Sequence, residues 1–365
     1  MTVLIFLAVL FVLVLVHEFG HFITAKWSGM RVDEFAIGFP PRLLSWKKGE
    51  TTYTLNIIPI GGFVRIYGEN GAEENGTLDT TRAFSYRPRI LQAIVLVAGV
   101  TMNILFAWFL YTSAYTIGVP TIVDEVHPGE HIPLVITSLL EKGVAKKAGL
   151  LSGDRILSLS APDGSRALLS PRDISNFIGA HGGIPLTLTY TRGETSHTTL
   201  LTPENISIAG EATRPRVGFT TGFVTLLSYP FSKAVVEGGK ETLYNARDIA
   251  TGLVSFFKQT AHGTAGLNDL TGPIGIAGMV GDASHFGLTA ILSFTAFISL
   301  NLAVVNMLPL PALDGGRLLI VGIEAIIRRP LNPKFIGNIY LGSFIFLILL
   351  MVLITGHDIV KLVHG

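Results

Sequence analysis

Four long apolar segments are the feature of this sequence that most restricts its fold. They cover residues 2–25, 90–117, 288–308 and 335–354, and each has about the 20 residues that a helix needs to cross a bilayer. Charged residues make up only 15 % of the chain, against 49 % hydrophobic residues and a mean hydropathy of +0.53. Soluble domains carry about 25 % charged residues. We therefore expect a polytopic α-helical membrane protein with four transmembrane helices.

The basic residues between these segments predict the orientation of the chain. The first segment lacks the basic start and the cleavage site of a signal peptide, so we expect it to remain as a span. Lys361 is the only Lys or Arg that follows the last segment, whereas two short loops are basic. The first loop contains Lys26, Arg31, Arg42, Lys47, Lys48, Arg65, Arg82, Arg87 and Arg89. The second contains Arg317, Arg328, Arg329 and Lys334. The positive-inside rule places both loops in the cytoplasm and both termini, with the region 119–287, outside.

The region outside the membrane is predicted to contain a compact α+β module. Residues 132–203 alternate strand and turn signals. The stretch 170–183 predicts a helix, because Ser170 can cap it, Pro171 fits its first turn and Gly182-Gly183 ends it. A hairpin is expected around Arg192-Gly193-Glu194.

The segments on either side of this module are less regular. Residues 204–225 read as a linker with some strand, and residues 229–259 predict an amphipathic helix. That helix either lies on the outer leaflet or packs on the outer module. The first cytoplasmic loop, residues 29–87, is strand-rich and broken by Pro59 and Gly61-Gly62, which favours a hairpin or small sheet that lies on the membrane or enters it.

The first apolar segment ends in the motif HEFGH, residues 17–21. His17 and His21 are four positions apart, so on a helix both imidazoles project from one face and can share a metal. Zinc fits such a site best, with a third hard ligand and one position left for water. Glu18 is offset from that face and can act as general base on the bound water. A chance match is the alternative, but three ionisable groups inside a spanning segment are costly and rarely lack a function.

Asp314 is the candidate for the third ligand. It lies in NMLPLPALDGG, residues 306–316, where Pro309 and Pro311 interrupt the helix. Irregular backbone at membrane depth is tolerated where it lines a cavity. The orientation above also places HEFGH and LDG at the cytoplasmic ends of their segments, at similar depth. On the motif alone, however, Asp314 could equally cap the N-terminus of a following helix.

These motifs resemble the site-2 protease family of intramembrane zinc metalloproteases. The resemblance rests on HEFGH, GGFVRIYGE, GPIGIA and NMLPLPALDGG, and the outer stretch AKKAGLLSGDRILSL (145–159) resembles a PDZ signature. One PDZ domain with four spans is similar to the bacterial regulator-of-sigma-E protease group. The implied organisation is span 1 (1–28), a cytoplasmic-side β-rich membrane loop (29–88), span 2 (89–118), an inserted extracytoplasmic PDZ domain (119–204), a linker with an interfacial helix (205–287), span 3 with LDG (288–316) and span 4 (335–358).

The resemblance also implies roles for individual residues. His17, His21 and Asp314 would bind Zn²⁺, and Glu18 would be the general base. Asn306 would hold substrate or the developing oxyanion, and Gly61, Gly62, Phe63 and Val64 would present an edge strand to an unwound substrate helix. Asn103 would face the site, although Gly99-Val100-Thr101-Met102-Asn103 lacks the proline of the family motif and these residues could equally pack helices.

The expected substrates are single-span membrane proteins, such as anti-sigma factors already trimmed outside or remnant signal peptides, in the inner membrane of a bacterium. A PDZ domain over the entrance would hinder substrates with large outer domains. The rival interpretations are a PDZ-bearing adaptor with an inactive metal site and a transporter that uses the buried His and Asp residues for proton coupling, although no inverted repeat is visible. A net charge of +1 argues against nucleic acid as a partner. The absence of cysteine excludes a thiolate zinc site.

Overall fold

A computed structural model describes residues 2–69, 80–123, 132–140, 143–166, 170–207, 213–264, 266, 271–329 and 331–364. The chain forms two compact units. The first contains Met1–Ser113, Phe231–Val280 and Leu292–Ile359, and the second contains Ala114–Pro230, Gly281–Ile291 and Val360–Gly365.

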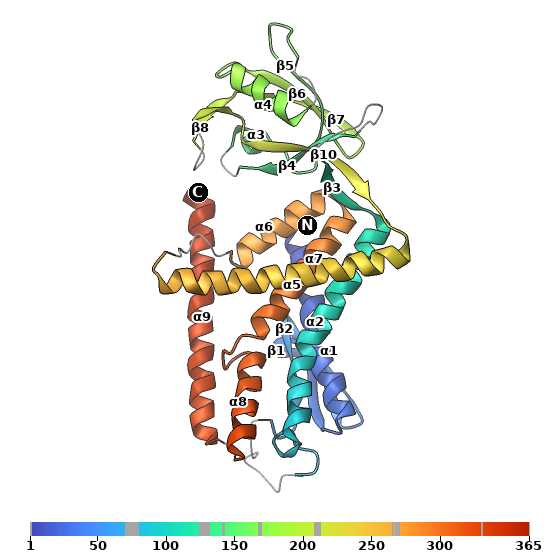
Figure 1. Cartoon of the computed structure of the whole chain (residues 1–365), viewed down its shortest axis with the longest axis vertical. Helices are drawn as coiled ribbons and strands as arrows, with labels where there is room; N and C mark the ends of the chain where they lie inside the picture. The colour runs from blue at the N-terminus through green and yellow to red at the C-terminus, as the bar shows by residue number, and fades with distance from the viewer. Residues whose placement is uncertain are drawn as a thin grey trace. The chain divides into compact units, whose positions relative to one another are not determined.

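Four helices, most of whose residues belong to the first unit, are long and apolar enough to cross a membrane. They are α1 (Thr2–Trp27), α2 (Arg89–Ile117), α7 (Leu288–Asn306) and α9 (Pro333–His364) (Figure 1). They coincide with the four predicted spans. In the apolar 18-residue core of each helix, 0–39 % of the residues are buried within the protein. Most of this apolar surface is therefore available to lipid. The expectation of a membrane protein built on several apolar helices is confirmed.

Small residues let these helices approach one another closely. Gly20 of α1 lies against α2, where a Cβ would be 2.8 Å from the side chain of Met102. Further along α2, Ala107 and Leu110 form a buried cluster with Ala296 and Leu300 of α7. Close packing of this kind is what holds helices together in lipid, where the hydrophobic effect gives no net attraction between them.

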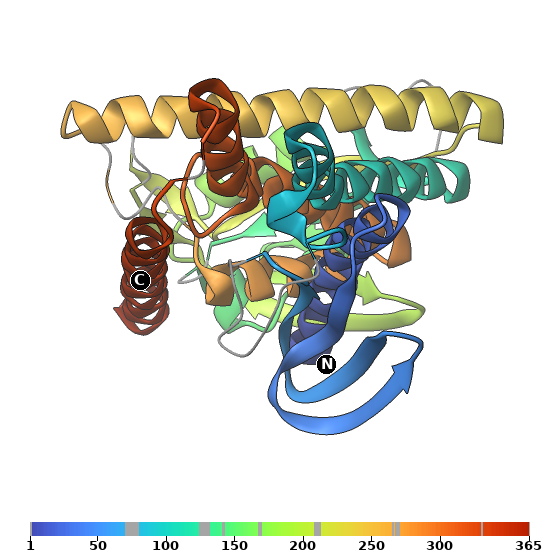
Figure 2. The ribbon, with the colours of Figure 1, turned by 90° about the horizontal axis from the view of Figure 1, so that it is seen from below.

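A long β-ribbon follows α1. It consists of β1 (Val32–Lys48) and β2 (Thr51–Ile66), which curl so that the first part of β1 has a partner on each side (Figure 2). Glu34, for example, is paired with Thr52 on one side and with Arg65 on the other. The strand-rich loop predicted at 29–88 is therefore a folded ribbon, and residues 62–66 pair with β1 on one side only among the described strands.

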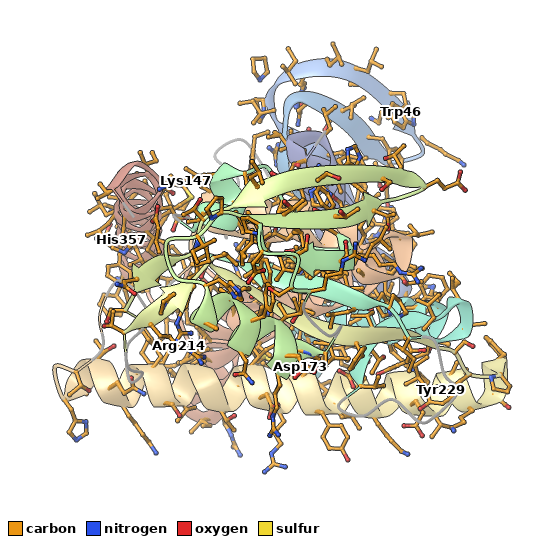
Figure 3. All side chains as sticks on the ribbon, turned by 90° about the horizontal axis from the view of Figure 1, so that it is seen from above. Trp46, Lys147, Asp173, Arg214, Tyr229 and His357 are labelled. Atoms are coloured by element: carbon orange, nitrogen blue, oxygen red, sulfur yellow. The ribbon has the colours of Figure 1, made fainter. Side chains whose placement is uncertain are left out.

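The distal arm of the ribbon, residues 39–58, exposes apolar side chains. Trp46, which is labelled in Figure 3, is 54 % exposed and stacks on Tyr53 at a ring separation of 5.7 Å. Other exposed apolar side chains of the arm are those of Phe39, Leu43, Leu44, Ile57 and Ile58. A contiguous apolar patch of this kind marks an interaction or membrane surface.

Helix α5 (Phe231–Ala261) is the predicted amphipathic helix, and Figure 1 shows it running crosswise to α1, α2 and α9. It belongs to the first unit and packs on α2, where Trp108 Nε1 donates a 2.9 Å hydrogen bond to the carbonyl of Val235. A Cβ at Gly238 would lie 2.8 Å from Thr112, so glycine allows the crossing.

The helix that begins in GPIGIA was not foreseen from the sequence. Helix α6 (Pro273–His285) begins in the GPIGIA motif, and the buried carboxylate of Asp358 on α9 accepts hydrogen bonds from the backbone N–H groups of Gly272 and Gly275, at 3.3 and 3.0 Å. A carboxylate suits a helix N-terminus because unpaired N–H groups and the positive end of the helix dipole meet there.

The second unit is built on an antiparallel sheet. Its strands are β3 (Val119–Val123), β4 (Leu134–Leu139), β5 (Arg155–Ser160), β6 (Leu186–Arg192), β7 (Thr195–Leu201) and β10 (Phe219–Leu227), in the order β3-β10-β4-β5-β6-β7. The short helix α3 (Val144–Lys147), helix α4 (Pro171–Ala180) and the strand pair β8 (Glu204–Ile206) and β9 (Arg214–Arg216) complete it. Ser170 caps α4 by accepting from the N–H of Asp173, as the sequence predicts.

The predicted end of the α+β module at residue 204 comes too early in the chain. Residues 204–225 were expected to be a linker with some strand, and β10 within and just after this stretch pairs with β3 on one side and with β4 on the other. Threonines and Gly222 obscure the strand pattern of FTTGFVTLL, and its partners are far away in sequence. The module therefore extends to about residue 227, beyond the predicted end at 204.

An ion-pair cluster ties α1 to the chain that follows the ribbon. Glu50 accepts hydrogen bonds from Arg82 at 2.6 and 2.8 Å and from Lys26 at 2.6 Å. The hydrogen bonds from Arg82, and then those from Lys26, lower the pKa of Glu50 from 4.5 to about 2. Because the folded pKa is depressed, this stabilisation is fully present above about pH 4.5 and is lost as the pH falls toward 2.

We predict that Glu50→Gln lowers the thermal midpoint at pH 7, and that the difference from wild type narrows as the pH is lowered through 4.5. The Glu50 side chain is 30 % exposed, so the effect should not exceed about 1 kcal/mol. Differential scanning calorimetry of the detergent-solubilised protein at pH 7 and pH 3 measures it, with the exposed Glu194→Gln as control. An equal difference at both pH values would contradict the assignment.

Candidate metal centre

The side chains of His17 and His21 project from one face of α1, as their spacing predicts. Both are buried, with exposed fractions of 7 % and 8 %, and their Nε2 atoms are 3.2 Å apart. The helix continues unbroken from Thr2 to Trp27, so the polar pair follows directly from the apolar run. Two imidazole nitrogens that face each other in a buried space need a shared partner.

Asp314 supplies that partner from a segment almost three hundred residues later. Helix α7 ends at Asn306, the chain turns through Pro309 and Pro311, and α8 (Asp314–Ile327) begins at Asp314. Asp314 Oδ2 lies 3.1 Å from His17 Nε2 and 3.3 Å from His21 Nε2. The N-cap position of α8 is Leu313, without a side-chain hydrogen bond, so the alternative in which Asp314 caps this helix is not what the structure has.

Two glycines allow this turn. A Cβ on Gly315 would collide with the carbonyl of Met307, and a Cβ on Gly316 would collide with the carbonyl of Leu310. The backbone of the turn therefore lies directly against the start of α8. This contact directs Asp314 back toward α1.

The three side chains fit a divalent cation. Their ligand atoms lie within 4.8 Å of one another, and Asp314 Oδ2 is buried without a hydrogen-bond partner. Ligands about 2.0–2.1 Å from a tetrahedral zinc ion are roughly 3.3 Å apart, close to the observed 3.1–3.3 Å. His21 Nδ1 lies 2.8 Å from the carbonyl of Val95, so its N–H is directed there and its Nε2 lone pair is left for a metal.

Glu18 lies beside this cluster and is not part of it. It lines a cavity of about 740 Å³ together with His17, His21 and Asp314. On the other side of Glu18 is β2, where the backbone N–H of Val64 is its hydrogen-bond donor. Glu18 thus faces the space in which a substrate would lie, one residue away from the first histidine.

The predicted substrate strand forms another wall of the cavity. Phe63 and Val64 line it. Gly62 lies between α1 and β1, because a Cβ there would be 3.5 Å from Glu18 Cγ of α1 and 2.8 Å from the carbonyl of Ala36 of β1. Gly61 has a positive φ of 100°, which favours glycine. The side of residues 63–66 that does not pair with β1 is therefore close to Glu18.

The two predicted asparagines occupy different places. The amide nitrogen of Asn306 lies 3.5 Å from His17 Nε2, and this side chain is part-buried. Asn103 was expected to face the site, but its side chain is 0 % exposed and its amide lies 3.2 Å from His17 Nδ1. It therefore lies behind the imidazole, away from the cavity.

One charged group in the cavity wall was not foreseen from the sequence. Arg317 was counted only as a basic residue of a cytoplasmic loop, yet its guanidinium lines the cavity, forms an ion pair with Glu69 and lies 5.6 Å from the centre of the Tyr340 ring. Arg317 and Glu69 are 33 % and 14 % exposed. Arg317 lies three residues after Asp314 and therefore on the same side of α8. This spacing could have identified Arg317 from the sequence. The contact joins α8 to the chain just after β2 and to α9.

Known proteins resemble this chain over nearly its whole length. The model of peptidase family M50 matches residues 5–350. The zinc metalloprotease RasP of Geobacillus kaustophilus is 31 % identical, with 98 % of this chain and 97 % of the relative covered. The zinc metalloprotease RasP of Bacillus licheniformis is 30 % identical, with 99 % of each covered.

We predict that Arg317→Glu destabilises the protein by about 1–3 kcal/mol, because Glu69 then loses its partner and meets a like charge. The double variant Arg317→Glu/Glu69→Arg should recover part of the loss. Thermal unfolding in detergent measures both, with Arg328→Glu at the exposed end of α8 as control. A double variant no more stable than Arg317→Glu would show that the ion pair does not join these segments.

Proposed function

This chain belongs to peptidase family M50 and is a zinc metalloprotease, and on that basis we propose that it cleaves peptide bonds within the membrane-spanning segments of single-span membrane proteins. The predicted family, enzyme class and zinc cofactor are thereby confirmed. The observation that carries the proposal is the position of the three-residue cluster at one end of an apolar 26-residue helix.

His17, His21 and Asp314 are the proposed zinc ligands. Their support is the mutual spacing of 3.1–3.3 Å and the unpartnered Oδ2 of Asp314. Two imidazoles and one carboxylate leave a fourth position open, as in catalytic zinc sites. When bound, zinc supplies a Lewis acid that lowers the pKa of a coordinated water toward neutrality.

Glu18 is the proposed general base. Its carboxylate faces the cavity beside the cluster without belonging to it. It takes the proton of the attacking water and passes it to the nitrogen of the leaving amine. Asn306 has an amide group 3.5 Å from His17 Nε2, where an N–H donor can stabilise the negative charge that develops on the scissile carbonyl oxygen.

The strand at Gly61–Val64 is the proposed substrate-binding edge. A helix hides its peptide groups in its own hydrogen bonds, so a transmembrane substrate must be extended before it can be cut. Backbone N–H and C=O groups on the unpaired side of residues 62–66 can hold such an extended segment by strand addition. The exposed apolar arm of the ribbon, which includes Trp46, supports the expectation that this element enters the membrane.

The α+β module of residues 119–227 is the proposed PDZ domain. Its sheet, the helix α4 and the stretch 145–159 support this assignment. A groove of about 400 Å³ lies between α4 and the segment Arg214–Thr221 and is lined by Ile174, Ile178 and Phe219. It has the apolar lining and the adjacent strand of a peptide-binding groove. The function proposed for this domain is to restrict substrates that carry large outer domains.

The substrates proposed are anti-sigma factors already shortened outside the membrane and remnant signal peptides. The location proposed is the inner membrane of a bacterium, with both termini and the proposed PDZ domain on the outside. The support for this orientation is the position of the basic residues in the two short loops. It places the cluster of His17, His21 and Asp314 near the cytoplasmic face.

We predict that Glu18→Gln abolishes cleavage of a tethered single-span substrate in proteoliposomes, with a loss of at least about 10²-fold, while the protein keeps one zinc ion. Cleavage is followed by mass spectrometry of the products and zinc by elemental analysis. Glu237→Gln on α5 is the matched control, because this carboxylate pairs with Lys240 of its own helix and does not line the cavity.

Two outcomes would count against the proposal in different ways. Undiminished cleavage by Glu18→Gln would refute the assigned base and the mechanism built on it. Product masses that place every cut outside the apolar segment of the substrate would leave a metalloprotease but would refute cleavage within the membrane.

A further inference from the structure

One stripe of α2 lies directly behind the two histidines. Val95, Gly99 and Asn103 are spaced by four residues, so they share one face of the helix. Each of them contacts His17 or His21. The contacts of Val95 and Asn103 are made at the Nδ1 atoms, so they leave both Nε2 atoms available to a metal.

Gly99 lets the helix approach the histidines. A Cβ at this position would be 2.8 Å from Cε1 of His17 and from Cε1 of His21, and it would collide with His21 Nε2. Both rings therefore lie on the bare backbone of α2. Any larger residue would displace one imidazole or push the helices apart.

Val95 and Asn103 lie beside the outward nitrogens of the two rings. The carbonyl of Val95 is 2.8 Å from His21 Nδ1, and the amide of Asn103 is 3.2 Å from His17 Nδ1. A carbonyl can only accept, so His21 carries its proton on Nδ1. The two rings share this arrangement, with one α2 group behind each.

The chemistry of a metal-bound imidazole decides how Asn103 is oriented. If Nε2 of His17 is a ligand, its lone pair is used there and Nδ1 carries a proton that needs an acceptor. The Asn side chain offers an acceptor oxygen and a donor nitrogen at nearly equivalent positions. Oδ1 of Asn103 is buried without a partner when the nitrogen faces His17. If the Asn103 amide is turned so that its oxygen faces His17, Oδ1 of Asn103 and Nδ1–H of His17 each gain a hydrogen-bond partner.

We propose that Asn103 is a positioning residue for the metal centre. Its Oδ1 accepts the hydrogen bond from Nδ1–H of His17 and thereby fixes the tautomer and ring orientation that direct Nε2 toward Asp314. It is the counterpart of the Val95 carbonyl behind His21. This inference rests on the proposed function, because it takes His17 as a zinc ligand.

The fold holds Asn103 in place for this task. Its side chain is fully buried, and its backbone carbonyl accepts a 2.8 Å hydrogen bond from Ser299 Oγ of α7. The residue is thus fixed between α1 and α7. A substrate in the cavity does not reach it, in contrast to the contact expected from the sequence.

The test compares Asn103→Leu and Asn103→Ala, which remove the acceptor, with Asn103→Asp, which keeps one. The full-length protein carries Glu18→Gln in a parallel set, so that zinc affinity is measured without turnover. Zinc is titrated against a chelator of known affinity, and the ligand-field spectrum is recorded after substitution by Co²⁺. Asn301→Leu on α7 is the matched control, since that amide donates to the carbonyl of Phe297 in its own helix.

We expect Asn103→Leu and Asn103→Ala to lose zinc affinity by about 10–100-fold and to shift the Co²⁺ spectrum. Asn103→Asp should stay within several-fold of wild type, and Asn301→Leu should be unchanged. In the active background, kcat should fall with the zinc occupancy while KM stays constant. If Asn103→Leu does not fold, Asn103→Ala, which keeps the helix and only removes the amide, decides the question.

Unchanged zinc affinity and spectrum in Asn103→Ala, with a raised KM, would overturn the inference and return Asn103 to a substrate contact. His17→Ala separates this result from a failure of the proposed function. If His17→Ala loses zinc and Asn103→Ala does not, the inference alone fails. If His17→Ala retains zinc with full affinity, the proposed ligand set fails and the inference fails with it.

Discussion

The structure depends on the meeting of two imidazoles and one carboxylate inside an apolar helix assembly. Such groups are costly to bury unless each is paired, and here each has a defined neighbour. The oxygen of Asp314 and the Nε2 atoms of the histidines converge to 3.1–3.3 Å. The opposite nitrogens face α2. The relative placement of α1, α2 and the start of α8 follows from this one requirement, and the interrupted end of α7 exists where Asp314 has to turn back toward α1.

Local patterns allowed a large part of this arrangement to be predicted. The four apolar lengths, the four-residue spacing of His17 and His21 and the prolines before Asp314 are all contained within short stretches of sequence. The contacts that were missed join distant positions. Val95 lies 74 residues from His21, Asn103 lies 86 residues from His17, and Glu69 lies 248 residues from Arg317. A backbone carbonyl such as that of Val95 cannot be recognised from the residue type. The place of β10 in the sheet was missed because its partners β3 and β4 lie far away in sequence.

The cavity combines two kinds of recognition. On the α1 side it presents ionisable groups in fixed positions, and on the β2 side it presents a backbone edge with Phe63 and Val64. In the proposed reaction the edge holds any extended chain through its peptide groups. Substrates are then selected mainly by how readily a segment can unwind from its helix. Arg317 links the two sides through Glu69 and reaches α9 through Tyr340. Arg317 therefore connects α8, which begins with Asp314, to the chain just after β2 and to α9.

Several positions of this site need glycine because a side chain would not fit there. At Gly62, Gly315 and Gly316 a Cβ would meet a backbone carbonyl, and at Gly99 it would meet the two imidazoles. Even a methyl group has no room there unless the backbone shifts or a histidine is displaced. Saturation mutagenesis should thus find two classes of intolerant position, those where a particular functional group is needed and those where any side chain is too much. A search for related sites that scores only reactive residues would overlook the positions where any side chain is too large. These positions determine the shape of the centre.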